Sequence, residues 1–164
     1  MDKMYAIDAN ILITANRRIY PFDIAPAFWR QLIAKGSDRL ILVDRVRDEI
    51  LRNEDQLAKW LKENANLMSL RLSADLNVVQ SYRRIVNSVV ENPQYKEAAK
   101  TEFAGVADSW LCAHALTYSY TVVTEEIHEP GSKRKVKIPN VCKEFSIEYI
   151  NTIQFIRELG IKFV

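Results

Sequence analysis

Short apolar segments alternate along the chain with longer segments in which apolar residues recur about every 3.6 positions. Short apolar runs that lead directly into a helix are typical of buried parallel strands. Four such runs lie at residues 4–7, 39–43, 121–124 and 147–150, and residues 161–164 predict a further short edge strand. We therefore predict one α/β domain over residues 1–164, with three α/β/α layers and a central, mostly parallel sheet of four to five strands.

Residues that begin or end helices divide the periodic segments between these strands. Asn10 and Asp44 are expected to cap helices that follow the first two strands, and Pro26 suits the first turn of a helix that Gly36 closes in the left-handed conformation. A charged hairpin or loop is expected over residues 125–139. Further helices are predicted over 55–91 with an extended piece at 66–72, from Pro93, over 101–118, over 141–145, and from Asn151 or Thr152 to Gly160.

The composition is that of an ordinary globular domain. The chain has 164 residues, of which 48% are hydrophobic and 27% charged, and only 4 glycines and 5 prolines, which excludes collagen-like and low-complexity structure. No apolar run approaches the about 20 residues that a membrane-spanning helix needs, and the N-terminus lacks the pattern of a secretion signal. We expect a cytoplasmic protein without a membrane partner, in which Cys112 and Cys142 are reduced.

The net charge of +2 is too small to indicate a polyanionic partner by itself. Basic residues nevertheless crowd one segment, and they are Lys133, Arg134, Lys135, Lys137 and Lys143. This cluster is suited to contact a phosphate backbone, and it is equally suited to form a solvated hairpin whose lysines protect a sheet edge. Both interpretations stay open at the level of the sequence.

Four acidic residues from separate segments are expected at one edge of the sheet. Asp8 ends the first strand, Glu49 lies in the helix after the second, Asp108 lies in the helix before the third, and Glu126 follows that strand. Ligands of open parallel sheets bind outside the carboxyl ends of the strands. Clustered carboxylates repel one another unless a cation or protons neutralise them, and sets of oxygen ligands favour Mg²⁺ or Mn²⁺. This pattern predicts metal-dependent phosphodiester hydrolysis by an activated water.

Each of these residues also has a structural interpretation. A single acidic residue is most often a solvated group or a helix cap, and Glu126 competes with two other glutamates of its loop. Asn10 and Thr124 are each suited either to orient a ligand or to cap a helix, and neither interpretation is preferred. His114 is expected to pack in the core rather than to act in catalysis, and Cys112 to be a small core residue.

Four stretches resemble motifs of the PIN-domain family of metal-dependent ribonucleases. They are Ile7-Asp8-Ala9-Asn10, Val46-Arg47-Asp48-Glu49-Ile50, Ala107-Asp108-Ser109-Trp110-Leu111-Cys112-Ala113-His114-Ala115 and Val122-Val123-Thr124-Glu125-Glu126. The resemblance covers essentially the whole chain and implies strand order 3-2-1-4-5. It also implies a Mg²⁺ or Mn²⁺ site in which Asp8, Glu49 and Asp108 form the carboxylate core. Asn10 and Thr124 would assist catalysis, and Glu126 stands where the family usually has a metal-binding aspartate.

The reaction implied by the resemblance is endonucleolytic cleavage of RNA that leaves a 5′-phosphate and a 3′-hydroxyl. The nearest branch looks like the VapC-type toxins of toxin–antitoxin systems, which implies a small antitoxin partner and a homodimer. The candidate RNA contacts are basic, and they are Arg17, Arg18, Arg45, Lys133, Arg134 and Lys135.

Two other functions stay open from the sequence. One is a non-catalytic module of the same fold that binds RNA or protein. The other is a phosphatase of the haloacid-dehalogenase type, since Asp8-Ala9-Asn10 faintly resembles its first motif. That chemistry needs a second acid where Asn10 stands, and an asparagine cannot serve as that acid.

Overall fold

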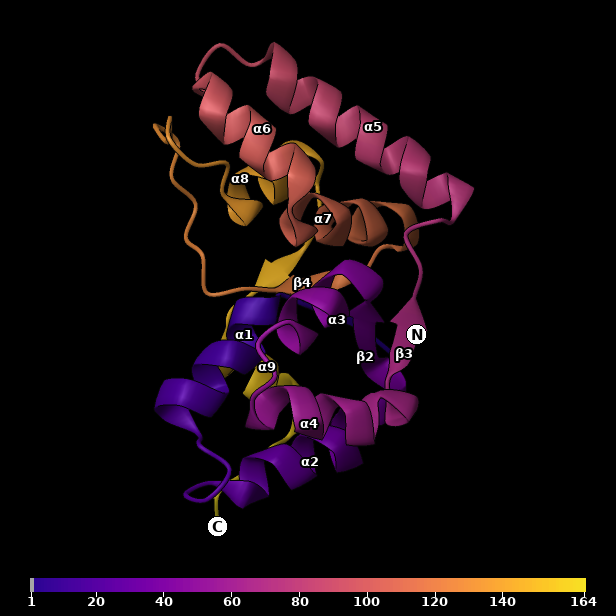
Figure 1. The fold of residues 1–164 in the computed structure, drawn as a ribbon, viewed down its shortest axis with the longest axis vertical. Helices are drawn as coiled ribbons and strands as arrows, with labels where there is room; N and C mark the ends of the chain where they lie inside the picture. The colour runs from indigo at the N-terminus through magenta and orange to yellow at the C-terminus, as the bar shows by residue number, and fades with distance from the viewer. Residues whose placement is uncertain (1) are drawn as a thin grey trace.

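The computed structural model describes residues 2–164 and has a five-stranded, all-parallel sheet at its centre (Figure 1). The sheet order is β3-β2-β1-β4-β5, which confirms the predicted α/β class and the strand order 3-2-1-4-5. The strands are β1 (Tyr5–Ile7), β2 (Leu40–Val43), β3 (Ser69–Arg71), β4 (Thr121–Val123) and β5 (Tyr149–Ile150). Every residue of β1, β2 and β4 is buried, as expected for strands covered on both faces.

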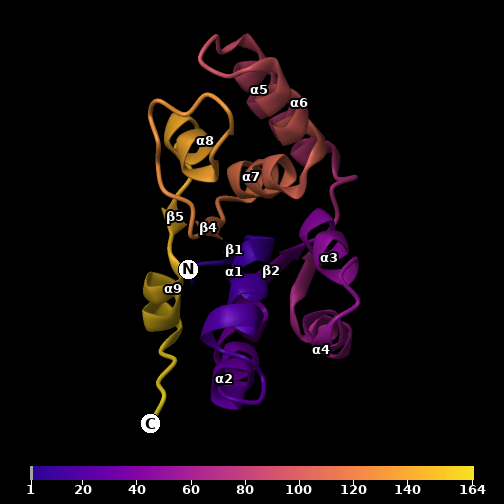
Figure 2. The same cartoon turned by 60° about the vertical axis from the view of Figure 1, so that its left-hand side comes forward.

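Helices connect all of the strands and cover both faces of the sheet. Figure 2 shows α7 against one face, with α5, α6 and α8 on the same side, and α2 and α9 on the opposite side. The α-helices are α1 (Ala9–Thr14), α2 (Pro26–Gly36), α3 (Asp44–Leu51), α4 (Gln56–Asn64), α5 (Leu76–Glu91), α6 (Glu97–Gly105), α7 (Ala107–Tyr118), α8 (Ile138–Glu144) and α9 (Thr152–Leu159). Shorter turns are the π-helix η1 (Ala15–Ile19) and the 3₁₀-helices η2 (Ser37–Arg39) and η3 (Ala65–Leu67).

Helix α7 is the central helix of its layer. Leu111, Cys112 and Ala113 are fully buried, and α7 packs against β1, β2 and β4 as well as against the neighbouring helices. A helix that is apolar around most of its circumference is buried on all sides. The N-terminal turn of α7, which carries Asp108, is thereby fixed close to the carboxyl ends of β1 and β4.

The helix boundaries correct three predictions. Asp8, and not Asn10, caps α1, because its carboxylate accepts a hydrogen bond from the backbone N of Asn10. Asp44 is the first residue of α3 rather than its cap, since the capping position is taken by Val43. Gly36 is right-handed with φ −109°, and a Cβ there would lie 3.0 Å from Leu40 Cγ. The glycine therefore provides space for Leu40 and does not reverse the chain.

Other predicted boundaries were also shifted. Pro93 lies in a turn and opens no helix, and the segment expected as one helix over 101–118 is broken at Val106, where φ −106° and ψ 169° are extended. Residues 161–164 form no strand, whereas the extended piece around β3 and the end of the last helix at Gly160 are confirmed, and Gly160 is left-handed with φ 75°. None of the helices described between residues 2 and 164 has the length and apolar character needed to cross a bilayer.

Candidate active site

The ends of β1 and β4 are joined side by side by a short hydrogen-bonded chain. Asp8 directly follows β1, and its backbone N donates to the carbonyl of Val123 at 3.0 Å. The hydroxyl of Thr124 donates to Asp8 Oδ2 at 3.1 Å and accepts from the backbone N of Glu126 at 3.1 Å. Thr124 is buried, so it fixes the Asp8 carboxylate against the loop that carries Glu126.

Asp8 is a buried carboxylate with incomplete hydrogen bonding. It is 3% exposed, and besides Thr124 it accepts only a long hydrogen bond of 3.4 Å from the backbone N of Asn10. Burial raises the pKa of Asp8 to about 6; the negative charges of Glu126 and Glu49 act in the same direction, while the hydrogen bonds from Asn10 and Thr124 lower it only in part. The carboxylate therefore lies in an environment that disfavours its negative charge.

Asp108 experiences the same acidic environment from the opposite side. Burial raises the pKa of Asp108 to about 7, and Asp8, Glu126 and Glu49 contribute in that order, while Lys135 opposes them. The other three acidic residues expected at this edge of the sheet are thus close enough to affect the ionisation of Asp108. Perturbed carboxyl pKa values of this kind are common at functional sites, although ion-pair networks produce them as well.

Glu126 and Glu49 complete the acidic group. Oε1 of Glu126 accepts from the backbone N of Ile138 at 3.2 Å, while Oε2 is buried, accepts no hydrogen bond, and lies 3.5 Å from Nζ of Lys135. Glu49 is half-buried on α3. This buried oxygen faces the Lys135 ammonium group without a hydrogen bond, and in an all-oxygen donor set a hard divalent cation would satisfy it.

The side chains do not surround an ion in their present conformations. Within residues 2–164 no three histidine, cysteine, aspartate or glutamate side chains lie close enough together to hold one. The donor types and the orphaned oxygen of Glu126 fit Mg²⁺ or Mn²⁺, but side-chain rotation would be needed to bring the oxygens to a common centre.

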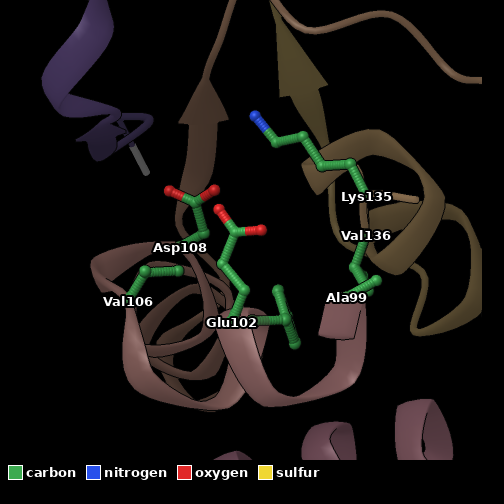
Figure 3. Close-up of a pocket in the computed structure, with 7 residues that line it drawn as sticks. Ala99, Glu102, Val106, Asp108, Lys135 and Val136 are labelled. Carbon is green, nitrogen blue, oxygen red and sulfur yellow. The ribbon is translucent and has the colours of Figure 1, made fainter. Parts of the chain in front are cut away.

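A small pocket beside Asp108 adds one residue that sequence reasoning missed. It is bounded by α6, by the start of α7 and by residues 135 and 136 of the loop after β4. In Figure 3 the carboxylates of Glu102 and Asp108 and the ammonium group of Lys135 point into the same space. Glu102 belongs to none of the motifs, and its only sequence signal is its position just before Gly105, where α6 ends.

The remaining predicted site residues lie farther apart. The side chain of Asn10 is exposed, and only its backbone contacts Asp8. Lys135 is exposed, and its ammonium group turns toward the acidic pocket. The other predicted RNA contacts are exposed on η1, on α3 and in the loop after β4, and they are Arg17, Arg18, Arg45, Lys133 and Arg134.

Comparison with known proteins identifies a family but no characterised relative. The sequence pattern of the family described as a domain of unknown function (DUF4411) matches residues 5–163, which is nearly the whole chain. No curated protein and no solved structure matches the chain.

Proposed function

The chain belongs to the family described as a domain of unknown function (DUF4411), and we propose that it is a metal-dependent endoribonuclease with a PIN-like active site. The observation that carries this proposal is the gathering of acidic side chains at the ends of β1 and β4: burial, together with acidic neighbours, raises the pKa of Asp8 to about 6 and that of Asp108 to about 7. Such a concentration of negative charge at the end of a parallel sheet is unfavourable unless a cation or protons neutralise it.

The residues that would hold Mg²⁺ or Mn²⁺ are Asp8, Glu49, Asp108 and Glu126. A bound ion of this kind supplies a water of lowered pKa and a positive charge beside a phosphoryl oxygen. Thr124 orients Asp8 through its hydroxyl, and the backbone N of Ile138 holds one oxygen of Glu126. Lys135 partly neutralises the same group of carboxylates.

The resemblance to PIN-domain ribonucleases supplies the substrate and the partners of this proposal. The strand order and the four motifs are those that the resemblance implies. We extend the proposal to a VapC-type toxin that cleaves RNA in the cytoplasm as a homodimer and is held inactive by a small antitoxin. A short reading frame beside this gene, encoding a DNA-binding fold with a charged tail, would support the antitoxin.

A non-catalytic PIN-like binding module is the second candidate. Two observations favour it: within residues 2–164 no three potential ligands lie close enough to surround an ion, and Lys135 already points into the acidic pocket. A protein of this kind would bind RNA or protein without cutting it and would not bind Mn²⁺.

Cleavage of labelled RNA with and without added Mn²⁺ tests the proposal. The purified protein should cut a mixed set of single-stranded RNAs in Mn²⁺ and should stop when EDTA is added. The products should carry a 5′-phosphate and a 3′-hydroxyl, because the resemblance implies that the 3′-oxygen leaves, and no 2′,3′-cyclic phosphate, because water and not the 2′-hydroxyl attacks. Intact RNA in excess Mn²⁺ across the whole set, together with the absence of Mn²⁺ binding, would favour the binding module.

A further inference from the structure

An open groove of about 440 Å³ runs between α3 and the junction of α6 and α7. The α3 side of the groove carries Arg45, Asp48, Glu49 and Arg52. Arg45, Glu49 and Arg52 are four and three residues apart and therefore share one face of the helix, while Asp48 is held in an ion pair with Arg47. The opposite side is formed by residues 105–107, where the chain breaks between the two helices. The groove has the size of a site that holds a small ligand or one segment of a larger one.

This groove leads into the acidic site. Glu49 lines the groove, and its charge also raises the pKa values of Asp8 and Asp108. Val106 lines both the groove and the small pocket that contains Asp108. A ligand lying in the groove would therefore reach the carboxylates at one of its ends.

The two arginines of the groove are exposed cations without acidic partners. Across residues 2–164 neither Arg45 nor Arg52 forms an ion pair, whereas Arg47 of the same helix pairs with Asp48 at 2.9 Å. Arg52 makes only a long contact of 3.5 Å from Nε to the backbone carbonyl of Asp48. Their guanidinium groups are therefore available to an anionic ligand.

The surroundings of Arg45 distinguish a phosphate contact from a base contact. The guanidinium carbon of Arg45 lies 4.8 Å from the ring centroid of Trp110, and Tyr82 stacks on that same ring at 3.9 Å. Two groups this close cannot occupy the same face, so both faces of Trp110 are covered. Trp110 thus supports Arg45 and offers no free face on which a base could stack.

We infer that this groove binds the sugar–phosphate backbone of a single RNA strand beside the bond that is cut, with Arg45 and Arg52 contacting phosphates. This inference rests on the proposed function for the choice of RNA. A flexible single strand can follow a groove between two helices, and electrostatic tracking of its backbone requires little sequence recognition. The contacts are consequently expected to be independent of base sequence and sensitive to salt.

Binding of fluorescent single-stranded RNA in EDTA tests the inference without metal or cleavage. We would compare the wild-type protein, the Arg45→Gln/Arg52→Gln variant, and the control Arg30→Gln/Arg157→Gln. The control removes two exposed charges from α2 and α9, which lie on the opposite side of the sheet from α7. Anisotropy would be measured at several salt concentrations with two unrelated RNA sequences and with an RNA duplex.

The groove variant should bind both single strands at least about tenfold more weakly than the control at low salt. Its plot of log affinity against log salt should be shallower by about 1.4, which corresponds to two lost phosphate contacts on a single strand. Equal losses in the groove variant and the control, a loss confined to one base sequence, or an effect on the duplex alone would each overturn the inference.

The inference and the proposed function can fail separately. If the protein cuts RNA in Mn²⁺ but the two double variants bind RNA equally, the groove assignment alone is wrong. If the protein neither cuts RNA nor binds Mn²⁺ and the arginine variants still weaken RNA binding selectively, the groove assignment holds and the nuclease proposal is wrong.

Discussion

Two aspartates follow neighbouring strands of the sheet, and their surroundings differ sharply. Asp44, after β2, accepts hydrogen bonds from the hydroxyl and backbone N of Ser73 at 2.6 and 2.9 Å and from the backbone N of Arg45 at 2.8 Å. Although burial acts to raise the pKa of Asp44, these hydrogen bonds bring it below its usual value. Asp8, after β1, has fewer and longer hydrogen bonds, and its pKa is raised to about 6.

The hydrogen-bonded cluster around Asp44 extends to the one histidine of α7, whose Nδ1 is buried without a hydrogen-bond partner among residues 2–164. The hydroxyl of Ser73 lies 3.1 Å from Nε2 of His114, which is 1% exposed. Burial lowers the pKa of His114 to about 4, so the imidazole is neutral near physiological pH. This agrees with the expectation that His114 packs in the core. The hydrogen bonds between Asp44 and Ser73 stabilise the fold, whereas the acidic group around Asp8 and Asp108 costs stability and is suited to bind a cation.

The largest expected effect is on RNA cleavage, which should depend on Asp8 and Asp108 but not on Asp44. Asp108→Asn and Asp8→Asn should each lower RNA cleavage at least about 100-fold, because each removes a carboxylate of the proposed metal site. Asp44→Asn should leave the rate per folded molecule within about twofold, since Asp44 contacts Ser73 and not the acidic group. Initial rates in Mn²⁺, normalised to the folded fraction from circular dichroism, measure both. Full activity of Asp108→Asn would contradict the nuclease proposal.

The free energy of unfolding should be lowered by the loss of Asp44 and not by the loss of Asp108, which is the reverse of the expectation for activity. Asp44→Ala is expected to lower the free energy of unfolding by about 2–3 kcal/mol, because two donors of Ser73 lose their acceptor. Asp108→Asn should raise it by about 1 kcal/mol at pH 8 without metal, because a buried charge with acidic neighbours is removed. Urea denaturation of the two variants measures both values. A destabilised Asp108→Asn variant would show that Asp108, like Asp44, stabilises the fold.

The pH dependence of stability should also have opposite signs in the two clusters. Asp8 and Asp108 keep their protons in the folded state up to about pH 6 and about pH 7, while in the unfolded chain they ionise near 3.8. Their contribution to stability is thus lost as pH rises from about 4 to 7. For His114 the folded pKa is about 4 and the unfolded value 6.5, so its contribution is lost as pH falls through that range.

Variants should therefore tilt the curve of stability against pH in opposite directions. Between pH 4 and 6.5, in EDTA, Asp108→Asn should make stability fall less with rising pH, and His114→Gln should make it fall more. His128→Gln, in the loop after β4, serves as the control for removing a histidine. Urea denaturation at three pH values gives the slopes, and identical slopes in all four proteins would contradict the assignment of the two clusters.

The smallest effect concerns the lysine in the acidic pocket. Lys135→Met should tighten Mn²⁺ binding about three- to fivefold, because the ammonium group competes with a metal ion for Glu126 and Asp108. Lys133→Met removes the same charge from an exposed position of the same loop and should change the affinity by less than about twofold. Calorimetric titration with Mn²⁺ compares them, and equal affinities would mean that Lys135 is an incidental neighbour.

The sequence was sufficient for the parts of the molecule that depend on local pattern. The apolar runs placed β1, β2, β4 and β5, although the run at 161–164 forms no strand and β3 was expected only as an extended piece. Asp8 after the first strand and Asp108 in the helix before β4 were thereby predicted near the same edge of the sheet. Contacts made through loop conformation were not predictable. Lys135 looked like one member of a basic surface cluster, and only the path of the loop after β4 brings it to Glu126. The helix break at Val106 sets the position of Asp108 and forms one side of the groove lined by Arg45 and Arg52. It follows Gly105, and no proline in the sequence indicates it.

Binding of Mn²⁺ is the most direct test of the central claim that this edge of the sheet is a metal site. Electron paramagnetic resonance titration at pH 7.5 should show bound Mn²⁺ in the wild-type protein and in Asp48→Asn, whose altered side chain is the exposed neighbour of Glu49. Glu49→Gln and Asp108→Asn should each lose about 10- to 100-fold in affinity. Equal Mn²⁺ binding by all four proteins, or none by the wild type, would contradict the account.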